Sequence, residues 1–285
     1  MNAGKLAVIY MSTRKTDKED SLKLAKLLKT HDEDELPIVA PPSDEEWERR
    51  KLLSEYRSLK CQRTKEINKL HAIFEHNGYT QFVRKDMCSE KNRANILPLL
   101  KGYEKEEAER LVERLNLLEK QIERLLQKIN AEVENDGKIQ KVMTVPGIGP
   151  ITALAYVAYV GDVNRFDNAH QVSNFIGFVP KVDNSCTICR SGHTTKKGNP
   201  LLRSLLVQAA WSTVKSKNGG ALRDKYKYMA DSRCIGKGKS IVTIARKLGE
   251  LLYLILKTDQ EYKPQKFITP ELKISKLAED ALECS

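Results

Sequence analysis

A heptad pattern of apolar residues constrains the fold of this chain most strongly. Six residues between 104 and 134 step alternately by four and three: Leu111, Leu115, Leu118, Ile122, Leu125 and Ile129. This spacing places one apolar seam along a helix, with Glu, Lys and Arg at the flanking positions. The seam predicts a coiled coil with a second copy of the chain or, alternatively, a hairpin with the chain's own helix expected from Ser43 to Asn77.

The positive charge of the chain is local. The 285 residues carry a net charge of +11, and the length suits two domains of roughly 150 residues. Between Lys181 and Glu250 lie fifteen Lys or Arg residues and four acids, which accounts for the whole net charge. Such a block predicts a polyanionic partner, most simply nucleic acid, bound in a salt-dependent way. The alternative is a solvated face that lysines happen to coat.

Cysteine usage and hydropathy indicate the compartment. The six cysteines are scattered through a chain larger than the small scaffolds that need disulfides. No apolar run approaches the ~18 residues of a membrane span. We therefore expect a soluble cytoplasmic protein that has no membrane partner.

Two carboxylates stand near the start of the chain. An apolar run from Leu6 to Met11 predicts a buried strand, and Thr16 with Glu19 forms a capping box for the following helix. Asp17 and Asp20 share one face of this helix, as oxygen ligands of Mg²⁺ would. Acids in a first turn also complement the helix dipole, and a two-metal site needs further acids.

Two glycines mark a turn between helices. Gly147 and Gly149 precede an apolar helix expected from Ile151 to Val160. In a helix-hairpin-helix turn, backbone N–H groups at this place hold a phosphate without reading bases. A plain tight turn explains the same residues.

A polar, basic loop is expected from Gly177 to Asn199, followed by a helix from Pro200 to about Val214. Its candidates are the nucleophile Ser185 and the cations Arg190, Lys196 and Lys197. A serine needs proton removal and charge stabilisation to act as a nucleophile. Otherwise it is a turn residue.

The same loop offers ligands of another kind. Cys186, Cys189 and His193, together with the distant Cys234, could form a structural zinc site. This grouping gives a weaker alternative, a zinc-bridged helical adaptor. A final helix is expected from Ile241 to Leu256, with Arg246 and Lys247 on its polar side.

The order of several motifs resembles the insertion-sequence transposases of the IS one-ten family, from Met1 to about Leu256. These motifs are Lys15-Thr16-Asp17-Lys18-Glu19-Asp20, the heptad helix, Val145-Pro146-Gly147-Ile148-Gly149-Pro150, Phe175-Ile176-Gly177-Phe178-Val179-Pro180, Ser185, Lys196-Lys197-Gly198-Asn199-Pro200-Leu201-Leu202-Arg203 and Ala245-Arg246-Lys247-Leu248. The resemblance implies a RuvC-like (RNase H-like) domain with four metal-binding acids, then a coiled coil, then a C-terminal serine transposase domain. Family members recombine element DNA with a target by means of a structured guide RNA.

Carried over by motif, Asp17 and Asp20 match the last two of the four acids, and Ser185 matches the serine that becomes joined to DNA. No acid precedes Asp17, so the sequence is expected to be N-terminally truncated, with weak or lost Mg²⁺ binding. In addition, Cys186 stands where the family commonly has glycine. The runner-up function is a catalytically inactive, nucleic-acid-binding remnant.

The predicted architecture is mainly α with a partial α/β remnant. It comprises a RuvC-like remnant (1–40), a helical and coiled-coil arm (41–137), an all-α transposase domain (138–258) and a polar tail (259–285). The predicted partners are the DNA of element ends and target, a guide RNA, and further copies of the chain bound through the coil. The predicted nucleic-acid-binding residues are Gly147, Gly149, Arg190, Lys196, Lys197, Arg203, Arg246 and Lys247.

Overall fold

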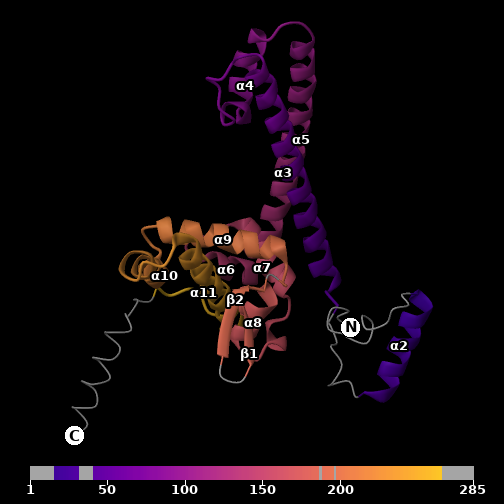
Figure 1. Ribbon diagram of the computed structural model, residues 1–285, viewed down its shortest axis with the longest axis vertical. Helices are drawn as coiled ribbons and strands as arrows, with labels where there is room; N and C mark the ends of the chain where they lie inside the picture. The colour runs from indigo at the N-terminus through magenta and orange to yellow at the C-terminus, as the bar shows by residue number, and fades with distance from the viewer. Residues whose placement is uncertain (1–15, 32–40, 186–187, 196, 265–285) are drawn as a thin grey trace. The chain divides into compact units, whose positions relative to one another are not determined.

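The computed structural model describes residues 16–31, 41–185, 188–195 and 197–264, with the backbone alone for 180–185 and 188–193. The chain divides into two compact units, Met1–Asp44 and Glu45–Ser285. The described residues are mainly helical, as expected (Figure 1). The helices are α2 (Asp17–Thr30), α3 (Asp44–His76), α4 (Glu90–Ile96), α5 (Gly102–Asn135), α6 (Gly137–Met143), α7 (Pro150–Val160), α8 (Ala169–Ile176), α9 (Pro200–Lys215), α10 (Gly220–Lys227) and α11 (Lys237–Thr258), and the strands are β1 (Pro180–Ser185) and β2 (Ile188–Thr194).

Helix α2 is the described element of the first unit. Its cap is the one that the sequence predicts, because the Thr16 hydroxyl accepts a hydrogen bond from the Glu19 N–H at 3.3 Å. The strand expected from Leu6 to Met11 lies outside the described residues. The RuvC-like remnant therefore remains a prediction.

Helices α3 and α5 form a helical arm within the second unit and run side by side (Figure 1). Arg49, near the start of α3, pairs with Glu132 near the end of α5 at 3.1 Å. Further along α3, Arg63 pairs with Glu119 at 2.7 Å. The residue number increases along α3 from Arg49 to Arg63, whereas that of the partner on α5 decreases from Glu132 to Glu119. The two helices are therefore antiparallel.

The apolar seam of α5 faces this antiparallel partner. Leu118 of this seam is half-buried. The other five residues are buried: Leu111, Leu115, Ile122, Leu125 and Ile129. Leu111 and Leu115 share a core with Ile67 and Leu70 of α3. The intramolecular hairpin is thus the alternative that the structure shows, and a coil between copies of the chain remains a prediction.

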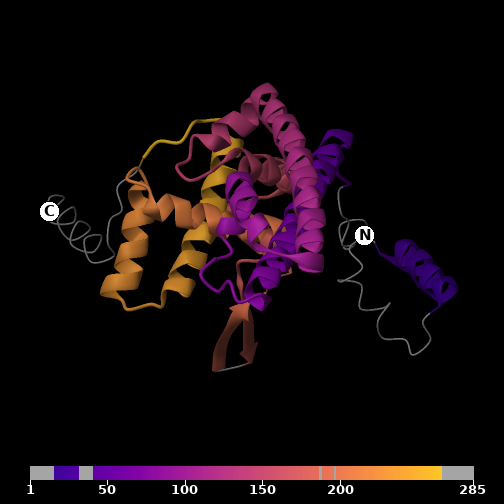
Figure 2. The same ribbon diagram turned by 90° about the horizontal axis from the view of Figure 1, so that it is seen from above.

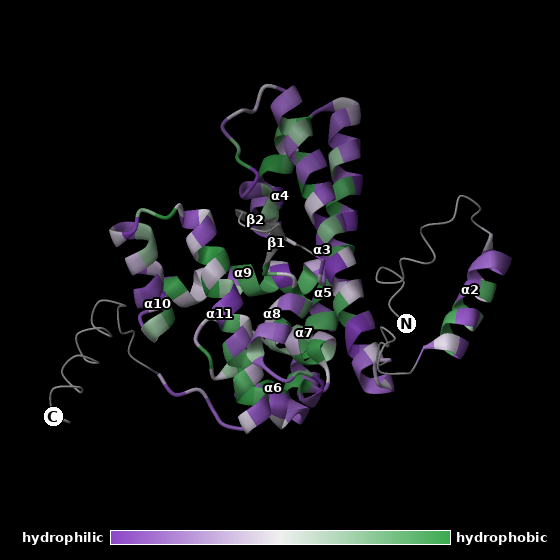
Figure 3. Ribbon diagram, turned by 60° about the horizontal axis from the view of Figure 1, so that its bottom comes forward, coloured by the Kyte–Doolittle hydropathy of each residue, from purple (hydrophilic) through white to green (hydrophobic). Residues whose placement is uncertain are grey.

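Helix α4 belongs to the arm, because its Arg93 pairs with Glu119 of α5. Helices α6 to α11 form a C-terminal body built around α7. Eight of the eleven residues of α7 are buried, as expected for a helix that is apolar on all sides. The fully buried Tyr156 donates from its hydroxyl to the Gly249 carbonyl of α11 at 2.6 Å. Figure 3 shows hydrophobic stretches along α7, whereas the arm helices alternate in hydropathy. In the part of the chain described, no helix is long and apolar enough to cross a membrane.

The segment expected to be a loop from Gly177 to Asn199 is instead largely a β-hairpin, so the C-terminal domain is not all-α. Strands β1 and β2 pair antiparallel, with Ser185 opposite Ile188. These strands are polar and lack the alternation that predicts a half-buried strand, which is why the sequence did not indicate them. Their backbone groups satisfy one another. Figure 2 shows the two strands projecting from the helices of the body.

Candidate nucleic-acid interface

The hairpin starts from a base in which two glycines meet. Gly177 ends α8 with φ +87°, and the backbone N of Gly198 lies 2.8 Å from where a Cβ on Gly177 would sit. A Cβ on Gly198 would overlap the carbonyl oxygens of Phe175 and Ile176. The Phe-Ile-Gly-Phe and Lys-Lys-Gly-Asn-Pro motifs therefore pack backbone against backbone, which only glycine permits.

Arg203 braces this hairpin base. Its Nη1 donates to the carbonyl of Ile176 at 3.1 Å and to that of Gly198 at 2.5 Å. The Ile176 carbonyl is one of those that a helix C-terminus leaves without an intrahelical partner. Burial lowers the pKa of Arg203. Arg203 thus has a structural role, and its phosphate contact remains a prediction.

Ser185 is the last residue of β1, next to the turn of the hairpin. Its backbone is described, whereas its side chain and residues 186–187 lie outside the described part. Arg190 stands opposite Asp183 in the ladder, Lys196 is not described, and Lys197 is exposed. The structure therefore places the backbone of Ser185 at the far end of a braced hairpin, and it leaves its reactivity untested.

The zinc grouping is untested for the same reason. Cys186 and the side chains of Cys189 and His193 are not described, and Cys234 is exposed. Among the side chains that are described, no three His, Cys, Asp or Glu come together as metal ligands.

The two glycines of the turn before α7 differ in their surroundings. Gly147 has φ +93°, and a Cβ there would lie 2.6 Å from the backbone N of Thr213 in α9. The Thr213 hydroxyl donates to the Pro146 carbonyl at 2.7 Å. Gly149 caps α7, and a Cβ there would meet open space. Gly147 is therefore required for close packing, while phosphate binding at either glycine remains a prediction.

The buried carboxylate of Glu250 binds Arg246 and Lys247, the two cations of the last predicted motif. Glu250 accepts hydrogen bonds from Arg246 Nε at 3.0 Å and Lys247 Nζ at 2.6 Å. Ser173 of α8 donates to the same carboxylate at 2.9 Å. Burial alone would raise the pKa of Glu250, but the hydrogen bonds from Lys247 and Ser173 outweigh it and hold the pKa below its usual value. Arg246 and Lys247, predicted to bind phosphate, are thus partly neutralised.

Helix spacing could have revealed part of this cluster. Glu250 stands four residues after Arg246 and three after Lys247, so their side chains are neighbours on α11. Ser173, which is 77 positions away, carries no such signal. Neither Glu250 nor Ser173 was predicted from the sequence as part of a site.

A third cation belongs to the same neighbourhood. Burial together with the positive charges of Lys247 and Arg246 lowers the pKa of Lys225 on α10. The end of α9, α10 and the start of α11 also carry exposed cations, here called the basic surface, that no motif predicted: Lys215, Lys217, Lys227, Arg233, Lys237 and Lys239.

Asp17 and Asp20 lie in the first turn of α2. Asp20 faces Lys23, with its Oδ1 3.6 Å from Nζ. No third acid joins them among the described residues. Two carboxylates, one of them paired with a lysine, do not by themselves fit the four-acid magnesium set that the resemblance implies.

Comparisons with known proteins match the segment that contains the candidate residues of the hairpin. Residues 139–227 match the model of the Transposase IS116/IS110/IS902 family. A Pseudomonas aeruginosa protein named "Probable family 20 transposase" is 37% identical over 105 residues, which is 37% of this chain and 31% of that one. The transposase for insertion sequence element IS1111A of Coxiella burnetii is 27% identical over 137 residues, covering 48% of this chain and 38% of that one.

A Sinorhizobium fredii protein, also named as a transposase, is 28% identical over 262 residues, 82% of this chain. The chain spans 31%, 38% and 64% of the lengths of these three relatives. The segment that contains α7, the hairpin and α9 is the part of the chain that matches the Transposase IS116/IS110/IS902 family. This match confirms the resemblance found in the motifs.

Proposed function

We propose that this chain acts in transposition of an insertion sequence, and that it cleaves and exchanges DNA strands through Ser185. The family match over residues 139–227 carries the proposal, because that segment includes the whole hairpin and its glycine base. The base anchors to the body the hairpin that carries Ser185. The basic surface of α9, α10 and α11 belongs to the same body and suits the phosphates of DNA.

The proposed step is attack by the Ser185 hydroxyl oxygen on a phosphorus atom of a DNA strand. A serine–phosphate ester forms, one P–O ester bond of the strand breaks, the hydroxyl proton passes to water, and the departing oxygen gains a proton. Developing negative charge on the phosphate is stabilised by cations such as Arg190, Lys196 and Lys197. Strand exchange is the reverse attack, by the hydroxyl of another strand.

Magnesium and partners complete the proposal. Mg²⁺ bound by Asp17 and Asp20 would need two further acids, and no part of the serine step depends on the metal. Nucleic-acid contacts are proposed at Gly147, Gly149, Arg203, Arg246 and Lys247. Element ends, target DNA and a structured guide RNA are the proposed ligands, in a cytoplasmic protein that self-associates.

Covalent trapping tests this function. The chain is incubated with labelled element-end DNA, guide RNA and Mg²⁺, and a protein–DNA adduct is sought on a denaturing gel. We expect an adduct with the parent, none with Ser185→Ala, and an undiminished adduct with Ser212→Ala, which removes an exposed hydroxyl on α9. An adduct that survives Ser185→Ala would overturn the serine step. DNA binding by the parent without any adduct would support the inactive, nucleic-acid-binding alternative.

A further inference from the structure

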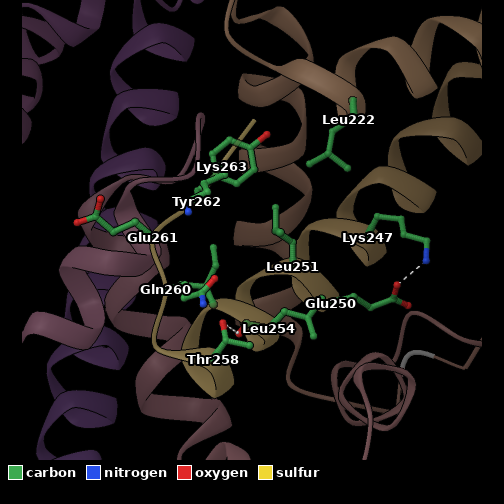
Figure 4. A pocket seen from close by; sticks show the side chains of 12 residues that line it. Leu222, Lys247, Glu250, Leu251, Leu254, Thr258, Gln260, Glu261, Tyr262 and Lys263 are labelled. Carbon is green, nitrogen blue, oxygen red and sulfur yellow. Dashed lines mark hydrogen bonds and ion pairs between the residues drawn. The ribbon is translucent and has the colours of Figure 1, made fainter. Parts of the chain in front are cut away.

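A pocket of about 420 Å³ lies between α10, α11 and the residues that follow α11 (Figure 4). Its volume falls within the range of about 300–1,000 Å³ typical of small-ligand sites. Apolar residues of the two helices, among them Leu222, Leu251 and Leu254, form one part of its lining. Leu254 is 48% exposed. The charged residues of the lining are two lysines and two glutamates: Lys247, Lys263, Glu250 and Glu261.

The segment after α11 forms the opposite wall and is held in place by two contacts. The Asp259 carboxylate lies 2.6 Å from Lys141 Nζ. The backbone N–H of Tyr262 donates to the Thr144 hydroxyl at 3.0 Å. Because these contacts anchor the segment to the body, the half-buried ring of Tyr262 has a fixed place in the lining.

The two ends of the pocket differ in chemistry. In Figure 4, Lys247 and Glu250 lie at one side and Tyr262 at the other, with Leu251 between them. Lys225 follows Leu222 by three residues and therefore lies on the same face of α10. One end thus offers Lys247, which is paired with Glu250, and Lys225 stands close enough to both to sense their charges. The other end offers an aromatic ring beside an apolar floor.

We propose that this pocket binds one unpaired nucleotide of a bound strand, with the base against Tyr262 and the leucine floor and the phosphate at Lys247 and Lys225. The inference rests on the proposed nucleic-acid function and adds a ligand class to it. Bases of any identity stack on aromatic side chains, while the neighbouring cations attract the backbone. A nucleotide combines a flat base with a negatively charged phosphate. The pocket offers Tyr262 and the leucine floor to the base, and Lys247 to the phosphate.

Other ligands match less of the pocket. A free phosphate uses the cations and leaves the apolar floor exposed. An uncharged apolar molecule would contact the leucine floor. It would offer no negative charge to Lys225 and Lys247, whose anionic neighbour is Glu250. An unpaired DNA nucleotide and an unpaired RNA nucleotide share the required chemistry, so the experiment includes both.

The test compares a perfect duplex with one that contains a single bulged nucleotide, as DNA and as RNA, by fluorescence anisotropy with the full chain. We expect the bulged form to bind about tenfold more tightly, since base–aromatic stacking contributes at this scale. Tyr262→Ala should abolish the preference, whereas Tyr262→Trp should keep it. The same substitution at Tyr103, which is 69% exposed on the arm, should have no effect.

A second measurement reads the pocket directly. With 2-aminopurine as the bulged base, stacking on Tyr262 should quench its fluorescence in the parent but not in Tyr262→Ala. Equal affinity for bulged and perfect duplexes, with binding intact, would overturn the pocket and leave the proposed function standing. Failure of the parent to bind any duplex would overturn both.

Discussion

The arm and the body each hold a partly buried carboxylate between two cations, yet the two acids do different work. In the arm, Glu119 receives Arg93 from α4 at 2.7 Å and Arg63 from α3 at 2.7 Å, so it ties three helices together. In the body, the two cations of Glu250 come from its own helix. There, the Ser173 hydroxyl of α8 joins Glu250 to another helix, and Gly147 packs closely against Thr213 of α9.

Similar ion pairs therefore have different structural roles in the two regions. Side chains that reach across from separate elements hold the arm together. The ion pairs on α11 join residues of one helix and partly neutralise two cations at the surface of the body. Substitutions in each region should therefore affect different properties.

The largest effect is expected for Gly147→Ala in the body. The new Cβ would lie 2.6 Å from Thr213 N and 2.9 Å from Ala209 O, at φ +93°. Backbone strain and overpacking together should lower the free energy of unfolding by about 4 kcal/mol, measured by urea denaturation. Gly149→Ala is the matched control in the same turn and should change it by less than about 1 kcal/mol. Equal losses would contradict a packing role specific to Gly147.

Arg93→Met should be the next most damaging change and should act on the arm alone. The Arg93 side chain is fully buried and donates to Met87 O at 3.1 Å and Asn116 Oδ1 at 2.9 Å besides Glu119. Breaking such a pair costs about 3 kcal/mol. Hydrogen exchange should rise in the arm and not in the body.

The control for Arg93 is Arg114→Met. Arg114 is 58% exposed and pairs with Glu66 at 3.8 Å, so its loss should cost no more than about 0.5 kcal/mol. Faster exchange in α7 or α11 of Arg93→Met would show that the two regions unfold together.

Glu250→Gln should have a smaller, pH-dependent effect. The folded pKa of Glu250 lies below the ordinary 4.5, so its stabilisation is present above that pH and is lost as the pH falls through the folded pKa. At pH 7 the variant should lose about 2 kcal/mol, and its difference from the parent should shrink in acid. Glu106→Gln, on an exposed arm pair, should show neither effect; a constant difference at every pH would contradict the ionic role of Glu250.

The sequence predicts the arm better than the body, for a physical reason. The seam of α5 depends on residues three and four positions apart, and such spacings are visible in a sequence. The cap at Thr16, which belongs to α2 of the first unit, is visible for the same reason. The partners of the body are distant: Gly147 meets Thr213, and Ser173 meets Glu250. The motifs that resemble the family include Gly147, Gly177, Gly198 and Ser185. No local pattern predicts that these glycines allow close packing or that Ser185 ends a strand.

The smallest effect separates the two regions by function rather than by stability. Lys227, exposed on α10 of the body, and Lys120, exposed on α5 of the arm, carry the same charge. If nucleic acid binds the basic surface of the body, Lys227→Gln should weaken duplex binding about two- to threefold and reduce the slope of log affinity against log salt by about 1. Lys120→Gln should leave both unchanged, because long-range attraction beyond a Debye length of about 8 Å is screened at physiological salt. An equal loss from the arm variant would mean that the duplex contacts the arm as well, so the body could no longer be treated as the only nucleic-acid-binding region.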